Sequence, residues 1–144
     1  MKTITSANSI FLLAVGSIYP VQQRIEGFSA DTAWMFDAVN NAEVYQGVDG
    51  KMSAGWVPHL TPMTIVLQPD KEGWEIFKNW HMAEESIREK LFADGTISIP
   101  SLGQRYVLSN GVLTGFDPVP GAKKTMQPVS YKITWETVTP SLIG

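Results

Sequence analysis

Residues 129–136 read Val-Ser-Tyr-Lys-Ile-Thr-Trp-Glu, and in this run large apolar and polar side chains alternate without interruption. Successive residues of a strand point to opposite faces of a sheet, so the pattern predicts a strand with one buried and one solvated face. The buried face would carry Val129, Tyr131, Ile133 and Trp135. The rest of the chain must supply the layer on which this sheet packs.

More extended segments precede this strand. Residues 105–108 and 112–114 flank the pair Asn110-Gly111. Asn-Gly tolerates the positive φ angles of a two-residue hairpin turn, so a hairpin is predicted at this pair. A short strand at 97–99 would end at Pro100, because proline cannot donate to a β ladder.

The first half of the chain also has β character. Strands are predicted at residues 9–15 and 63–67, and at 24–36 with a bulge near Gly27. The turn Val48-Asp49-Gly50-Lys51 lies between β-forming residues on both sides, which predicts a hairpin with Trp56 near its end.

One helix is predicted, from about residue 71 to about residue 92, with Asp70 as its cap and Gly95 just beyond its end. Apolar residues at helical spacing form a single stripe: Ile76, Trp80, Ala83, Ile87 and Leu91. Glu84 and Glu85 are placed on the opposite, solvated side. The predicted fold class is therefore mainly β, a sandwich or barrel of about seven to eight strands with one α-helix.

At 144 residues the chain is expected to form a single domain over residues 1–144, with mobile segments at 1–8 and 139–144. No apolar run approaches membrane-spanning length. The formal net charge is −3, and the 11 Lys and Arg residues are scattered, which argues against a nucleic-acid-binding stripe. There is no cysteine, so disulfides and thiolate metal sites are excluded.

Candidate catalytic groups are few. His59 lies in a proline-rich loop and His81 on the helix, without further ligands at metal-binding spacing. Glu84 and Glu85 are neighbours on a helix, so their side chains diverge by about 100° and cannot flank one bond. We therefore expect no enzyme, no cofactor and no metal site. Of the five tryptophans, Trp74, Trp80 and Trp135 are assigned to the core, and Trp34 and Trp56 to a subunit interface or a ligand.

Several short motifs between residues 64 and 137 occur in a characteristic order. They are Leu-Gln-Pro-Asp at 67–70, Pro-Ser-Leu-Gly at 100–103, Gly-Val-Leu-Thr-Gly at 111–115, Ala-Lys-Lys at 122–124, Gln-Pro at 127–128 and Ile-Thr-Trp-Glu at 133–136. In order and spacing this half of the chain resembles the tail tube proteins of phages and prophages, small structural proteins of the virion tail.

The resemblance implies a fold and an assembly. Tail tube proteins have a β-sandwich closing on a helix, related to the tubes of contractile tails and of type VI secretion. It implies that six copies form a homohexameric ring, that rings stack into a hollow tube, and that genomic DNA passes through the lumen without specific binding. The implied partners are other copies and other tail proteins: baseplate, tape measure, terminator and, where present, a sheath touching the helix. The implied location is the virion tail, assembled in the host bacterial cytoplasm.

The resemblance also implies that a long hairpin loop, here about residues 40–59, reaches the neighbouring ring. Its candidate stacking residues are Tyr45, Asp49, Gly50, Lys51, Met52 and Trp56. An ordinary exposed hairpin is the alternative for this segment. For the whole chain the alternatives are a baseplate or tail-completion ring protein of the same fold, or a small β-barrel module that binds an apolar ligand.

Overall fold

A computed structural model describes residues 9–25, 34–69, 72–123 and 125–142. Within them the chain forms nine strands, one α-helix and one 3-10 helix, so the predicted mainly-β fold class is confirmed. The elements are β1 (Ile10–Val15), β2 (Tyr19–Arg24), β3 (Trp34–Phe36), β4 (Ala42–Gln46), β5 (Met52–Trp56), β6 (Thr61–Leu67), α1 (Glu72–Ile87), β7 (Ala93–Ile99), η2 (Pro100–Leu102), β8 (Gln104–Phe116) and β9 (Val129–Leu142).

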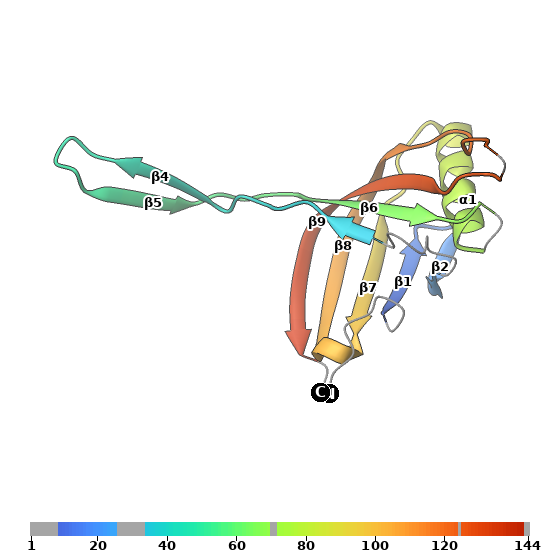
Figure 1. Cartoon of the computed structure of the whole chain (residues 1–144), viewed down its shortest axis with the longest axis horizontal. Helices are drawn as coiled ribbons and strands as arrows, with labels where there is room; N and C mark the ends of the chain where they lie inside the picture. The colour runs from blue at the N-terminus through green and yellow to red at the C-terminus, as the bar shows by residue number, and fades with distance from the viewer. Residues whose placement is uncertain (1–8, 26–33, 70–71, 124, 143–144) are drawn as a thin grey trace.

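Seven strands form one antiparallel sheet in the order β2-β1-β7-β8-β9-β6-β3. The two long strands, β8 and β9, bend across the molecule (Figure 1). In one half, residues 137–142 of β9 pair with residues 104–109 of β8. In the other half, residues 129–135 of β9 pair with β6. The bend thus folds a single sheet into two layers.

The core fills the space between these layers and the helix. It contains the four residues that alternation predicts on β9, together with Phe11 and Leu13 of β1, Met63 and Ile65 of β6, and Phe77 and Trp80 of α1. Trp80 and Trp135 are fully buried. Burying such large apolar side chains stabilises the fold by about 1.5–3 kcal/mol for each residue. Phe77 also stacks at 4.9 Å, between ring centroids, on Tyr131 of β9.

The predicted hairpin at Asn110-Gly111 is wrong, because both residues lie inside the continuous strand β8. Asn110 has a φ of 52° and its backbone N–H donates to Asp94 Oδ1 at 3.2 Å, where the pairing of β7 with β8 shifts register. Asn-Gly therefore marks a bulge and not a turn. A Cβ on Gly111 would come within 2.6 Å of the Trp135 ring, so glycine is needed there for packing.

The predicted strand at residues 24–36 is also wrong in extent. Arg24 ends β2, which begins at Tyr19, and Trp34–Phe36 form the separate strand β3. The expected bulge near Gly27 lies outside the described residues. Pro20 lies inside β2. β2 is an edge strand, and an edge tolerates a residue without an N–H. At the C-terminus, residues 139–142 pair with β8.

The helix ends at Ile87, one turn before the predicted end near residue 92. Arg88 takes a positive φ of 56°, and the chain then turns back. Glu84, predicted on the solvated side, is 7% exposed and binds this turn. Its carboxylate accepts from Leu91 N at 2.9 Å and from Lys90 Nζ at 3.2 Å. Lys90 Nζ also donates to Leu113 O at 3.0 Å, which ties the turn to β8. Gly95, the expected helix stop, lies in β7.

We expect Glu84→Ala to lower the free energy of unfolding by about 1–3 kcal/mol, because the Leu91 N–H loses its acceptor and Lys90 loses its carboxylate partner. Urea unfolding followed by tryptophan fluorescence measures the loss. Glu85→Ala is the matched control, since the Glu85 side chain is 72% exposed and contacts only His81 at 3.4 Å among described ion pairs. Equal stability of the two variants would contradict a structural role for Glu84.

Candidate assembly surfaces

The β4–β5 hairpin projects from the body of the molecule (Figure 1). Its two strands form a separate sheet, and every residue of both strands is exposed. The six candidate stacking residues all lie on this hairpin, as the sequence predicts for a single long loop. An isolated two-stranded hairpin is marginally stable in water at best. Both faces of the projecting ribbon are therefore accessible to a partner.

The tip is closed by local hydrogen bonds. Gly47 N donates to Lys51 O at 2.8 Å and Gly50 N to Gly47 O at 2.9 Å, with Gly50 at a φ of 82°. The Asp49 carboxylate accepts from Lys51 N at 3.0 Å. Asp49 and Gly50 thus have a conformational role in the turn. Val48, which the sequence does not single out, is fully exposed at the tip.

The two faces of the hairpin differ in character. The register pairs Ala42 with Trp56, Val44 with Ala54 and Gln46 with Met52, and paired residues share one face. This face is apolar except for Gln46, and Trp56 on it is 75% exposed. The opposite face carries Glu43, Tyr45, Ser53 and Gly55. The candidate residues Met52 and Trp56 therefore share a face, and Tyr45 points the other way.

The main sheet has open edges on both sides of the section formed by β2, β1, β7, β8 and the distal part of β9. β2 is the first strand of the sheet. On the other side, β6 covers β9 only as far as Trp135, so among the described strands residues 137–142 pair with β8 alone. Each open edge is six residues long. Unpaired edges are templates for pairing with another chain.

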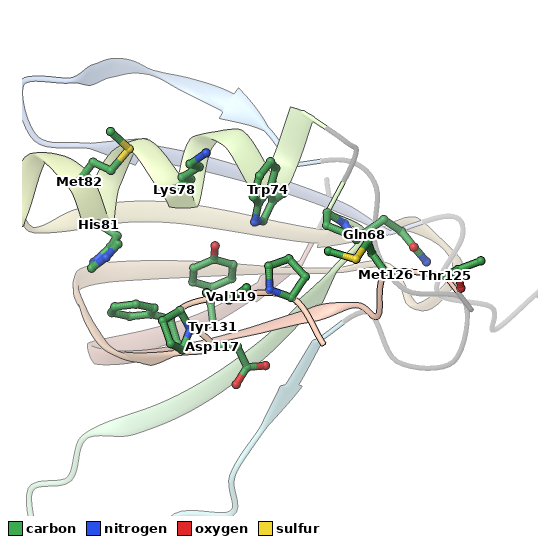
Figure 2. Close-up of a pocket in the computed structure, with 14 residues that line it drawn as sticks. Gln68, Trp74, Lys78, His81, Met82, Asp117, Val119, Thr125, Met126 and Tyr131 are labelled. Atoms are coloured by element: carbon green, nitrogen blue, oxygen red, sulfur yellow. The ribbon is translucent and has the colours of Figure 1, made fainter. Parts of the chain in front are cut away.

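A groove of about 880 Å³ lies between α1 and the segment that joins β8 to β9. Trp74 is directed from the helix toward Tyr131 on β9, and Val119 of the connecting segment lies close to Tyr131 (Figure 2). Met126 lines the groove farther along, beside Gln68 and Thr125 (Figure 2). The His81 and Phe116 rings are 3.9 Å apart, and Lys78 Nζ lies 4.8 Å from the centre of the Trp74 ring. The helix α1, which lines the groove, is at the opposite end of the molecule from the hairpin (Figure 1).

Burial raises the pKa of Tyr131 from 10.0 to about 12; the nearby Asp117 charge adds to this and a hydrogen bond with Trp74 opposes it. A folded-state pKa above the unfolded value means that unfolding releases a proton at high pH. The contribution of Tyr131 to stability is then fully present below about pH 10 and is lost as pH rises from about 10 to about 12. Urea titrations across this range check the expectation. Tyr131→Phe should lose this part of the pH dependence, and a variant that keeps it would contradict the assignment to Tyr131.

The two histidines considered as candidate catalytic or metal-binding groups lie in different parts of the molecule. His81 lies in the groove and His59 lies near Trp56, at the base of the hairpin. In the described part of the chain, no group of three or more His, Cys, Asp or Glu side chains could hold a metal ion. None of the helices described is both long and apolar enough to span a membrane.

A model of the family described as tail fiber protein gp32 matches residues 2–139. No curated protein matches the sequence. A sheath–tube complex of an extracellular contractile injection system contains a similar chain, at 18% identity and a TM-score of 0.62, covering 92% of this chain and 88% of that one. A chain of the anti-feeding prophage baseplate, six-fold symmetrised, is 9% identical with a TM-score of 0.59, and the match covers 99% of this chain and 98% of that one. A chain of the cap that terminates the anti-feeding prophage tube is 14% identical with a TM-score of 0.56, and the match covers 99% of this chain and 93% of that one. At identities this low, the likenesses establish the fold alone.

Proposed function

We propose that this chain, which belongs to the tail fiber protein gp32 family and is a phage tail-type structural protein, is the subunit of a tail tube. Six copies form a ring, rings stack into a hollow tube, and genomic DNA passes through the lumen to the host cell. The observation that carries this proposal is the pair of open sheet edges of equal length.

Ring closure follows from these edges. If residues 137–142 of one copy pair with β2 of the next, the sheets become a continuous barrel. Antiparallel edges that stay open invite uncontrolled pairing, and closure around a cyclic ring removes them. This heterologous contact uses different edges of the two copies, as a ring with more than two members requires.

The outer face of this sheet section suits a channel wall. It is rich in hydroxyl side chains: Thr96, Ser98, Ser109, Thr137, Thr139 and Ser141. The charged residues on that face are Asp94 and Glu136 against Arg24 and Arg105, so their signs cancel. A positively charged wall would retain DNA, because each phosphate that it neutralises releases counterions and strengthens binding. Each such phosphate steepens the dependence of the logarithm of the binding constant on the logarithm of salt concentration by about 0.9. A wall without net charge makes few such contacts and lets DNA slide.

The hairpin serves the stacking of rings. In the proposed tube it reaches the neighbouring ring and buries the apolar face around Val44, Met52 and Trp56 there. Baseplate, tape-measure and terminator proteins are the proposed partners at the ends and inside, and a sheath, where the tail has one, covers the outside. Assembly is proposed to occur in the host cytoplasm.

A second candidate is a ring protein of the baseplate or tail end that does not polymerise. It is favoured by the likeness to a baseplate chain and to a tube-terminating cap, which have TM-scores close to that of the sheath–tube complex. In this role the hairpin would meet a different tail protein.

Negative-stain electron microscopy over a concentration series, with light scattering for mass, tests the proposal. Six-fold hollow rings that stack into tubes are the expected result. Single rings at every concentration would favour the second candidate, and three-fold rods would favour a fibre subunit. A strictly monomeric protein with a bound apolar molecule would contradict self-assembly and favour the small binding module.

A further inference from the structure

We infer that the groove between α1 and residues 116–126 receives the tip of the β4–β5 hairpin of a second copy of this chain; this rests on the proposed stacking of rings. The hairpin and α1, whose residues line the groove, lie at opposite ends of the molecule (Figure 1), so one copy cannot join them. A contact between two different surfaces can be repeated from copy to copy, and it generates a filament when the rotation between copies does not close into a ring. Stacking of rings along a tube is the open case.

The two surfaces match in polarity. At the tip, Val48 is a fully exposed aliphatic side chain with no cover from its own chain. In the groove, Val119 is 71% exposed, and Met82 and Met126 are each 54% exposed. Methionine side chains are flexible and polarisable, which lets them adapt to an inserted side chain. Together they provide an apolar surface for Val48.

The charges at the tip and at the rim of the groove are also complementary. Asp49 stands beside Val48, and its carboxylate uses one oxygen for Lys51 N. The second oxygen is available to a cation. Lys78, an exposed residue on the helix side of the groove, supplies a positive charge close to the Trp74 ring. With Val48 inserted, Asp49 would face Lys78, and desolvation by the surrounding apolar side chains strengthens such a pair.

Cysteine cross-linking tests the contact directly, because the chain has no cysteine of its own. The double variant Val48→Cys/Met82→Cys, assembled and mildly oxidised, should give a ladder of covalent multimers on a non-reducing gel. The control is Val48→Cys/Leu102→Cys: Leu102 is 48% exposed but lies in η2, at the opposite end of β7 from the helix turn. This pair should give no ladder.

Each outcome decides. Tubes seen by electron microscopy without a Val48–Met82 ladder would overturn the inference and leave the proposed function standing. Covalent dimers of Val48→Cys alone would indicate that two tips meet, which also overturns it. Absence of rings and tubes for the unmodified protein would refute the proposed function and this contact with it.

A charge exchange gives an independent readout. Lys78→Glu should raise the protein concentration needed for stacking by about ten-fold, which corresponds to 1.4 kcal/mol. Adding Asp49→Lys to the same chain should restore most of the loss, since the pair is re-formed with reversed signs. Asp49→Asn removes the negative charge but keeps a side-chain oxygen that can accept from Lys51 N. This variant therefore tests the effect of the charge on stacking without loss of the hydrogen bond that holds the turn. No restoration in the double variant, together with undiminished stacking of Asp49→Asn, would exclude the pairing of Asp49 with Lys78.

Discussion

Replacing residues 43–55 by a two-residue Asn-Gly turn is expected to abolish ring stacking and leave the subunit folded. The replacement joins Ala42 to Trp56, which already face each other in the hairpin. The removed residues form their own small sheet and contribute nothing to the buried core, so we expect the free energy of unfolding to change by about 0.5 kcal/mol or less. Electron microscopy and light scattering should find separate rings and no tubes.

Variants of single faces sharpen this test. Met52→Ser lies on the apolar face of the hairpin and should weaken stacking. Tyr45→Ser removes a large side chain of similar exposure from the opposite face and is the matched control. Weaker stacking for Met52→Ser than for Tyr45→Ser would assign the contact to the apolar face. Full-length tubes from the shortened hairpin would refute the stacking role of the five candidate residues that it removes, all but Trp56.

The largest effect on stability is expected for Trp135→Ala. Trp135 is fully buried where β9 leaves the cover of β6. Its indole N–H points to Met63 Sδ at 3.3 Å, and its ring covers Gly111 and Gly95, neither of which has a side chain to fill the space left behind. Truncation should therefore leave a large cavity and lower the free energy of unfolding by about 3–5 kcal/mol.

The matched control is Trp56→Ala, which removes the same side chain from a site that is 75% exposed. It should change the free energy of unfolding of the isolated subunit by about 0.5 kcal/mol or less. If Trp135→Ala proves too unstable to purify, Trp135→Phe keeps most of the volume and should lose a smaller amount, measured by urea unfolding. A loss for Trp56→Ala as large as that for Trp135→Ala would contradict the assigned core.

Local pattern was sufficient where neighbouring residues determine the structure. Alternation along residues 129–135 identified the buried face of β9, and all four predicted residues are in the core. The Asp-Gly turn identified the β4–β5 hairpin, because a two-stranded ribbon closes through hydrogen bonds within a few residues. Alternation within residues 42–46 and 52–56 would also have revealed the apolar face and Val44.

Tertiary contacts decided the remainder. Asn110 can serve a turn or a bulge, and Asp94 on the adjacent strand selects the bulge by accepting its N–H. Glu84 reads as a solvated residue, yet the chain folds back over it and supplies Leu91 N and Lys90 as partners. The open edges and the groove depend on where β6 ends against β9 and on how the connection after β8 lies along α1. The sequence by itself determined the periodic elements, whose partners are near in the chain; only the folded chain decided the sites built from residues that are distant in sequence.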